Sequence, residues 1–248
     1  MIDIHAHILP AVDDGAADLH SALAMAELAV SGGVTAIVAT PHCGLPGQDL
    51  PEHLRLLART FDAFRQALED SGSPLQLYPG MEIFGTRDTA RYLDKGLLTT
   101  LNGSRYPLIE FPFRDYSREA TDILRDLLDM GLRPVVAHPE RYQYVQAFPP
   151  VLNLWADMGC LFQINRGSLL GRFGAGAEEL SFAMVSRGFV CSIASDAHSP
   201  LHRTTWMQDI RELIRDEFSP STAQLLLEER PRLLLEDKLI PMNEPDWF

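Results

Sequence analysis

Cysteine is scarce in this chain, and long hydrophobic runs and an excess of positive charge are both absent. The three cysteines are Cys43, Cys160 and Cys191. An odd number of cysteines in no paired spacing is typical of a reducing compartment, not of a disulfide framework. No apolar run approaches the roughly 18 residues that a membrane span needs. The start, Met-Ile-Asp-Ile-His, lacks the basic and apolar regions of a secretory signal. We therefore expect a cytoplasmic protein with no membrane span.

The charge balance also narrows the classes of partner. The chain has 21 Lys and Arg against 34 Asp and Glu, a formal net charge of -13. Such a chain is repelled by nucleic acid and by anionic membranes, so neither is expected as a partner. Bound divalent cations would reverse this balance locally. With 248 residues, 46% of them hydrophobic, the chain is long enough to bury a sizeable core without disulfides.

Short apolar runs typical of strands alternate with segments of helical periodicity. The expected strands are Ile2–His7, Ala36–Thr40, Gln76–Ile83, Leu108–Phe111, Pro134–Ala137, Leu161–Ile164 and Val190–Ala194. Seven such alternations predict an α/β fold with a parallel sheet, and at this length a closed or distorted barrel is favoured over an open sheet. We expect a single domain over residues 1–240, followed by a tail at 241–248. Docking of that tail and fraying of the terminus are both open, fraying being the more common outcome.

Two segments illustrate the helix predictions. In Ser117–Gly131, Ser117 is the expected N-cap and Gly131 the expected stop. The residues expected to share its apolar face are Ala120, Ile123, Leu124, Leu127 and Leu128. Asp18–Gly33 has the same pattern and ends at a Gly-Gly pair. Its expected apolar face consists of Leu19, Ala22, Leu23, Ala26 and Val30.

Candidate metal ligands follow or end these strands. They are His5, His7, Asp14, His42, Glu82, Glu110, His138, Asp196 and His198. In a parallel barrel the carboxyl ends of the strands share one face, where active sites are built. Histidines and carboxylates together suit zinc, manganese or iron. Nine ligands exceed the needs of one ion, so we expect a cluster in which a carboxylate bridges two ions.

The spacing within pairs strengthens this interpretation. His5 and His7 are two residues apart on a strand, so both side chains point to the same side and can bind one ion. Asp196 and His198 have the same spacing. A single histidine at a strand end is more often a structural hydrogen-bonding residue than a ligand, but nine coincidences at equivalent positions are improbable. His20 and His53 lie in helical stretches and are expected to be solvated, and the role of His202 stays open.

These motifs together resemble the PHP (polymerase and histidinol phosphatase) family. The resemblance rests on the candidate ligands above and on the phrases Asp3–Pro10, Val12–Ala16, His138–Tyr142, Gln163–Asn165, Gly167–Leu169 and Ser195–His198. The greatest similarity is to bacterial manganese-dependent protein-tyrosine phosphatases of capsular and exopolysaccharide operons. The match runs from about residue 1 to about residue 235, and the combination of motifs is specific, whereas His-x-His alone is not.

The resemblance implies a distorted (β/α)7 TIM-like barrel of PHP type that holds three divalent metal ions, manganese first, with iron or zinc as alternatives. By position, the first ion would be bound by His5, His7, Glu82 and Asp196, the second by Glu82, Glu110 and His138, and the third by Asp14, His42 and His198. The family also implies that Arg141 and Arg203 bind phosphate, which suits the planar fork of arginine. A metal-bound hydroxide would then be the nucleophile that attacks phosphorus.

Three positions differ from the residues that are frequent in the motifs of the family. Ala11 stands where glycine is frequent, Cys43 stands where a histidine often follows His42, and Arg166 replaces a small residue. Arg166 follows the sixth strand and is a candidate for a third cation near the site. These departures put substrate preference in doubt more than metal binding.

A covalent route through cysteine is the rival phosphatase chemistry. It requires an arginine six residues after the cysteine and a glycine-rich loop around phosphate. Position 49 is Asp, which excludes Cys43, while Cys160 has Arg166 at that spacing. The five residues between them alternate like a strand and contain no glycine. We expect substitution of either cysteine to leave phosphatase activity largely intact.

Three functions follow from these observations, in descending order. The first is a protein-tyrosine phosphatase linked to regulation of capsular or exopolysaccharide synthesis, whose partner is a phosphotyrosine protein such as a polysaccharide-regulating tyrosine kinase. The second is a small-molecule phosphatase of the same family, acting on histidinol phosphate or a sugar phosphate. The third is a metal-binding regulatory domain without turnover. Loops mostly shorter than 15 residues favour an open site and the first function. The sequence leaves oligomeric state and native metal undetermined.

Overall fold

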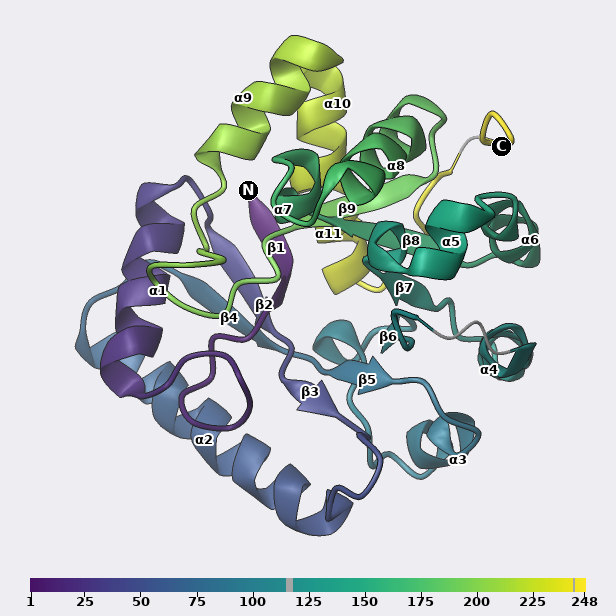
Figure 1. Ribbon diagram of the computed structural model, residues 1–248. Coiled ribbons are helices and arrows are strands. Elements are labelled where there is room, and N and C mark those ends of the chain that lie inside the picture. Colours follow the sequence, from purple (N-terminus) through teal and green to yellow (C-terminus); the bar gives the residue numbers. More distant parts are fainter. Residues whose placement is uncertain (115–117, 243) are drawn as a thin grey trace.

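The structure, a computed structural model, describes residues 1–114, 118–242 and 244–248. Strands occupy the centre of the molecule and helices lie around them (Figure 1). The strands are β1 (Ile2–Ala6), β2 (Ala36–Ala39), β3 (His42–Cys43), β4 (Gln76–Pro79), β5 (Glu82–Phe84), β6 (Leu108–Glu110), β7 (Val135–Ala137), β8 (Leu161–Asn165) and β9 (Val190–Ala194). The longer helices are α1 (Leu19–Ser31), α2 (Leu50–Asp70), α4 (Arg118–Asp129), α6 (Val151–Met158), α8 (Ala175–Ser186) and α9 (Gln208–Glu217). The short helices are α3 (Thr89–Asp94), η1 (Leu101–Gly103), η2 (Pro139–Arg141), α5 (Gln143–Ala147), α7 (Arg166–Leu169), α10 (Pro220–Gln224), η3 (Leu225–Glu229) and α11 (Arg230–Leu235).

All the expected strand positions contain strands, but two of them are bent. The prediction of one strand over Gln76–Ile83 is wrong, because the chain breaks at Gly80-Met81 into β4 and β5. A Cβ atom at Gly80 would lie 2.7 Å from Val38 Cγ1, so the break depends on a close approach that only glycine permits. The strand β2 likewise continues past Pro41 into the unexpected strand β3.

These breaks divide the described strands into two parallel sheets. One has the order β1-β2-β4 and the other the order β3-β5-β6-β7-β8-β9. With β2–β3 and β4–β5 taken as two bent strands, the strand order follows the sequence around the molecule, as in the expected distorted (β/α)7 barrel. Because every pairing between the strands is parallel, their carboxyl ends lie on one face.

The barrel closes where β9 meets β1. His7 N donates to Ala197 O at 2.9 Å, and Asp196 N donates to His5 O at 2.9 Å. The buried side chain of Asp3 reinforces this closure, because its Oδ1 accepts from Ser195 N at 3.0 Å. The first and last predicted ligand pairs are therefore brought together by backbone hydrogen bonds.

The two helix predictions are confirmed in place and corrected in detail. The α4 face predicted from periodicity is buried at Ala120, Ile123, Leu124 and Leu127, while the expected cap at Ser117 lies outside the described residues. In α1 the Asp18 side chain accepts from Ser21 N at 2.7 Å, which caps the helix, and the helix stops at Gly32-Gly33. Leu19, however, is 46% exposed. The expected residues Ala22 and Ala26 are buried, together with Met25 and Ala29, and Leu23 and Val30 are partly buried against the core.

The C-terminal tail docks onto the domain. The side-chain amide of Asn153 donates to Phe248 O at 3.3 Å and accepts from Phe248 N at 3.2 Å. The Phe248 ring lies 5.1 Å from that of Phe189. Of the two outcomes open at the sequence level, docking is the one observed, because these paired hydrogen bonds and ring contacts offset the entropy of ordering the tail.

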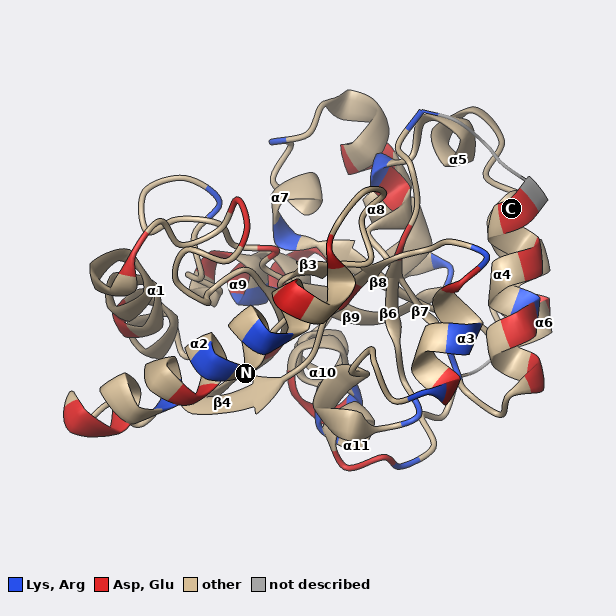
Figure 2. Cartoon of the chain, turned by 90° about the horizontal axis from the view of Figure 1, so that it is seen from below, with Lys and Arg blue, Asp and Glu red and all other residues tan. Residues whose placement is uncertain are grey.

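Charged residues of both signs are distributed along the outer helices, α2 and α4 among them, and are not segregated by sign (Figure 2). The net charge of -13 is thus spread over the molecule. Within the described ranges, none of the helices has the length and apolar character needed to cross a membrane.

Candidate metal centre

The nine predicted ligands converge on the face formed by the carboxyl ends of the strands. His5, His7, Glu82, Asp196 and His138 are at most 1% exposed, and Glu110 and His198 are at most 9% exposed. His42 is partly exposed and Asp14 is exposed. These side chains come from strand ends or adjoining turns almost 200 residues apart in the sequence, and the fold places all nine in one cluster. Buried charged and polar groups at this density require mutual pairing or a bound cation.

Glu82, at the start of β5, lies at the centre of the cluster. Its Oε1 is 2.8 Å from His138 Nε2 and 3.3 Å from His5 Nε2. Its Oε2 is 2.9 Å from His42 Nδ1 and 3.2 Å from His7 Nε2. Each carboxylate oxygen thus faces two imidazoles, which is the arrangement expected of a carboxylate shared between two ions.

Asp14 lies at the outer edge of the cluster. Its Oδ1 is 3.4 Å from His42 Nε2 and 3.5 Å from His198 Nε2. His7 supplies a fourth donor atom within reach of the same point, because donor atoms of these four residues all lie within 4.8 Å of one another. The group predicted from the resemblance is therefore present as a spatial cluster, with His7 added to it.

The other two predicted groups overlap in space. Close donor sets are formed by His5, His7 and Asp196, by His5, Glu82 and His138, and by His42, Glu82 and Glu110. Glu110 also lies 3.7 Å from His138 through its Oε1. Glu82 belongs to two of these sets and contacts the third through His5 and His7, so the geometry is that of one continuous cluster.

Asp196 connects the cluster to the two predicted phosphate-binding arginines. Its Oδ1 lies 3.5 Å from the Nε2 atoms of His5 and His7. Its Oδ2 accepts from Arg141 at 3.0 Å and forms an ion pair with Arg203. One carboxylate thus places the arginine side chains directly beside the histidines.

The residues that orient the ligands were not assigned this role from the sequence. Asp13 Oδ2 lies 2.8 Å from His7 Nδ1 and accepts from His42 N at 3.0 Å. Gln163 Oε1 lies 2.9 Å from His5 Nδ1. Asn165 donates to Asp196 Oδ2 at 2.6 Å. Metal-binding histidines commonly use their second ring nitrogen in this way, which fixes ring orientation. The signal that could have identified these residues was their place in two of the motifs that resemble the family, Val12–Ala16 and Gln163–Asn165.

The electrostatics of the cluster reflect dense packing of opposite charges. Burial alone would lower the pKa of His7, but hydrogen bonds to Asp13 and Glu82 outweigh it and raise the pKa to about 10. For His42, burial is likewise outweighed by Asp14 and Glu82, and the pKa rises to about 11. Burial raises the pKa of Glu110 to about 7, with repulsion from Glu82 adding to it. In the chain alone, protons on His7 and His42 offset part of the carboxylate charge, whereas burial lowers the pKa of His138 to about 4 and leaves it neutral.

The donor set fits divalent metal ions. Imidazole nitrogens and carboxylate oxygens are ligands for manganese, iron and zinc. His5 Nε2 and His7 Nε2 lie 3.2 Å apart, both facing the carboxylates of Glu82 and Asp196. Nitrogen atoms and carboxylate oxygens that converge on shared points are arranged as ligands around a cation. The residues present therefore fit the predicted kind of cofactor.

Two expectations about residues near the site are wrong. Arg166 adds no free cation, because its buried guanidinium forms an ion pair with the partly exposed Asp209 of α9. His53 is partly buried instead of solvated, and its Nε2 lies 2.9 Å from the backbone oxygen of His42. His20 and His202 are exposed. Both expectations failed because the interaction partner, Asp209 for Arg166 and His42 for His53, lies on another helix or strand.

The cysteines lack the environment of nucleophiles. Cys43 and Cys160 are 0% and 4% exposed, and burial raises the pKa of each thiol to about 12. Cys160 directly precedes β8, at the opposite end of that strand from Asn165 and the ligand cluster. The geometry is therefore incompatible with the rival cysteine chemistry.

Several residues at the site have left-handed backbone conformations. The φ angles of His138, Asp196 and Arg203 are 33°, 49° and 39°, and that of Ala11 in the neighbouring loop is 56°. This conformation is uncommon for residues other than glycine, and it concentrates where function imposes a geometry. Ala11 thus occupies a position whose backbone favours glycine, in agreement with the frequent glycine at this position in the family.

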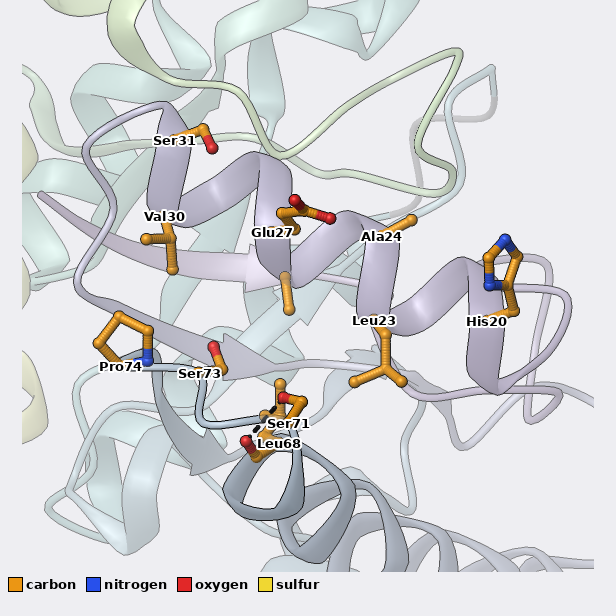
Figure 3. Close-up of a pocket in the computed structure, with 11 residues that line it drawn as sticks. His20, Leu23, Ala24, Glu27, Val30, Ser31, Leu68, Ser71, Ser73 and Pro74 are labelled. Atoms are coloured by element: carbon orange, nitrogen blue, oxygen red, sulfur yellow. Dashed lines mark hydrogen bonds between the residues drawn. The ribbon is translucent and has the colours of Figure 1, made fainter.

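A cavity of about 460 Å³ lies away from the ligand cluster, between α1 and the end of α2. In Figure 3, Leu23 and Val30 project from α1 toward the segment that carries Leu68, Ser71 and Ser73. The cavity shares no residue with the nine ligands and has a mostly apolar lining. It is therefore separate from the candidate metal centre.

Comparisons with known proteins agree with this geometry. The chain is 37% identical over 247 residues to tyrosine-protein phosphatase YwqE of Bacillus subtilis, covering 99% of this chain and 95% of that protein. It is 31% identical over 245 residues to tyrosine-protein phosphatase CpsB of Streptococcus pneumoniae, covering 97% and 100%. A solved structure from work on YwqE and CpsB, described as unique metal-dependent tyrosine phosphatases, superposes with a TM-score of 0.92 at 35% identity. It covers 100% of this chain and 99% of the solved one.

These comparisons confirm the resemblance expected from the sequence motifs. Residues 1–236 match the family described as "Capsular polysaccharide synthesis, CpsB/CapC". A match over that range includes every ligand in the cluster and both arginines. The chain therefore belongs to the CpsB/CapC family of capsular polysaccharide synthesis proteins.

Proposed function

We propose that this chain is a metal-dependent protein-tyrosine phosphatase that binds three divalent ions, with manganese as the native metal. The observation that carries the proposal is the position of Glu82, whose two oxygens each face two histidines. One ion would be held by His5, His7, Glu82 and Asp196, a second by Glu82, Glu110 and His138, and a third by Asp14, His42 and His198. When bound, such ions supply a nucleophile for hydrolysis at neutral pH and neutralise charge on the phosphoryl oxygens.

The arginines would bind the phosphoryl group. Arg141 and Arg203 both approach Asp196 Oδ2, next to the cluster where phosphorus would lie. Arg203 Nε is buried and has no acceptor among the described residues, and a phosphoryl oxygen would satisfy this donor. Arginine suits this role because its planar fork can contact two oxygens at once. Charge that develops on phosphoryl oxygens would be stabilised by groups already in place.

Phosphotyrosine is the substrate that best agrees with the relatives, which are named tyrosine-protein phosphatases. The partner we propose is a tyrosine kinase that regulates capsular or exopolysaccharide synthesis, since the family is described by that process. A cytoplasmic location is part of the proposal. It is supported by three cysteines that form no disulfide.

The test compares substrates on metal-loaded protein. Hydrolysis of a phosphotyrosine peptide and of histidinol phosphate should be measured under the same conditions, with manganese, iron or zinc restored to metal-free protein. We expect a higher kcat/KM for the peptide and the greatest activity with manganese. Faster turnover of histidinol phosphate would replace the proposal by a small-molecule phosphatase. Metal binding without hydrolysis of either substrate would leave only a regulatory domain.

A further inference from the structure

Two phenylalanines adjoin the proposed phosphate-binding arginines, and neither contributes a metal ligand. Phe113 lies three residues after the end of β6, and Phe173 lies between α7 and α8. The guanidinium carbon of Arg141 is 4.6 Å from the centroid of the Phe113 ring and 4.2 Å from that of Phe173. We refer to Phe113 and Phe173 as the aromatic pair.

Each ring of the aromatic pair also contacts a second residue of the site besides Arg141. The Phe113 ring is stacked on that of His138, with centroids 5.5 Å apart and planes at 20°. The guanidinium carbon of Arg203 lies 5.8 Å from the Phe173 ring. One ring therefore joins Arg141 to a proposed metal ligand, and the other joins it to the second arginine.

The position of the Phe173 ring is determined by close packing against Gly167 of α7. A Cβ atom added at Gly167 would lie 2.7 Å from Phe173 Cε2, so the ring packs directly against the α7 backbone at a glycine. Phe173 and Phe113 are both partly buried, which limits the freedom of the rings. Close packing of this kind fixes the surface on which the guanidinium lies.

We propose that the aromatic pair holds the Arg141 guanidinium, and in part that of Arg203, with its N–H edge toward the phosphoryl site. The proposal rests on the proposed function for its substrate, and it assigns a positioning role to residues outside the ligand set. An aromatic face attracts the face of a guanidinium and leaves the in-plane N–H groups free to donate. Without these faces, the long arginine side chain samples more rotamers, and phosphate binding must order it.

The primary test is the binding of inorganic phosphate to metal-loaded protein, measured by calorimetry. Phe173→Leu removes the aromatic face and keeps an apolar side chain, and we expect it to weaken phosphate binding by roughly 5- to 10-fold. Phe173→Tyr should restore binding to near the parent value. Phe148→Leu is the matched control, because Phe148 is 64% exposed at the end of α5. Metal content and thermal melting should be recorded for each variant.

A double-mutant cycle separates positioning from a general structural effect. In an Arg141→Ala background, Phe173→Leu should weaken phosphate binding by much less than in the parent, because its main target is missing. An equal loss in both backgrounds would show that Phe173 does not act through Arg141. Phosphate binding by Phe173→Leu within twofold of the parent, at unchanged metal content, would also overturn the proposal.

A second readout requires neither metal nor turnover. In metal-free protein labelled with ¹⁵N-arginine, the Arg141 Nε–H signal should show a ring-current shift, identified by its loss in Arg141→Lys. Phe173→Leu and Phe113→Leu should each move this signal toward the value of a free arginine, and Phe148→Leu should not. An unshifted signal in the parent would overturn the aromatic contact, whereas failure to hydrolyse phosphotyrosine would overturn only the proposed substrate. Failure of the metal-loaded parent to bind phosphate would overturn the role assigned to the N–H edge.

Discussion

Glu82 Oε1 lies 2.8 Å from His138 Nε2, although 56 positions separate the two residues in the sequence. The opposite oxygen of the same carboxylate lies 2.9 Å from His42 Nδ1. Glu82 therefore connects His42, the first residue of β3, with His138, which directly follows β7. This arrangement makes the Glu82 carboxylate the group on which a multinuclear centre depends.

Asp13→Asn should weaken metal binding. The Asp13 Oδ2 atom interacts with both His7 Nδ1 and His42 N, and its Oδ1 accepts from Gly15 N at 2.9 Å. An amide has only one oxygen, so it cannot replace both carboxylate oxygens as acceptors. Loss of such an orienting partner typically lowers metal affinity by about 10- to 100-fold. Metal titration of the metal-free protein measures the effect, and excess metal should restore activity. Asp94→Asn, at an exposed aspartate of α3, is the control. Equal metal affinities of Asp13→Asn and Asp94→Asn would show that Asp13 does not support metal binding.

Metal affinity should rise with pH. The pKa values of His7 and His42 stand near 10 and 11, so both imidazoles carry protons at neutral pH that a metal ion must displace. The logarithm of apparent affinity should therefore rise by about two for each pH unit between pH 6 and 8. Calorimetry in buffers of different ionisation enthalpy gives the number of protons released. Binding that releases no protons would contradict the raised pKa values of His7 and His42 in the metal-free protein.

The same pKa shifts predict the sign of the stability change in metal-free protein. Both histidines have folded-state pKa values above the ordinary value of 6.5. Their protonation therefore stabilises the folded state fully below about pH 6.5, and this contribution is lost as pH rises through 10 and 11. Metal ions replace the protons, so the increase in Tm on metal addition should grow with pH over the same range.

Cys43→Ser and Cys160→Ser should keep most of the phosphatase activity. Both thiols are buried, with pKa values raised to about 12, so neither is available as a thiolate nucleophile at neutral pH. Steady-state kinetics should show kcat/KM close to that of the parent. Labelling by iodoacetamide should be slow in native protein and rapid after unfolding. Near-complete loss of activity at unchanged metal content would favour the cysteine route instead.

Ala11→Gly should preserve or increase stability. A non-glycine residue at φ 56° costs about 1–2 kcal/mol in the left-handed region. The greater freedom of glycine in the unfolded chain offsets about 0.5–1 kcal/mol of this. A net gain of up to about 1 kcal/mol corresponds to a rise in Tm of about 2–4 °C. Ala17→Gly, in the same loop without a positive φ, should lower Tm, and a similar decrease for Ala11→Gly would contradict the argument.

The sequence predicted the positions of the strands and the convergence of the ligands. The carboxyl ends of parallel strands lie on one face. The position of Glu82 or His138 along the chain was therefore sufficient to predict that the residue belongs to the ligand cluster. The bends at Pro41 and Gly80-Met81 were not predicted, and the second of them depends on a close approach between neighbouring strands. At Gly80 that approach is the contact with Val38, which no local pattern reveals.

Contacts between side chains that are distant in the sequence could not be predicted either. Arg166 was expected beside the site because it follows the sixth strand, but Asp209 lies 43 positions further on and binds its guanidinium. Phe173 belongs to no recognisable motif, and its contact with Arg141 depends on the packing of the turn between α7 and α8 on Gly167. Spacing predicts which strand end a residue occupies, whereas side-chain partners depend on tertiary packing.

The most direct test of the multinuclear centre is the number of metal ions bound per chain. Elemental analysis of metal-replete, purified protein should find three divalent ions in the parent and fewer in Glu82→Gln, together with a loss of activity on the order of 100-fold or more. Circular dichroism establishes that the variant remains folded. Fewer than two ions per parent chain, or a Glu82→Gln variant with unchanged metal content, would contradict the account.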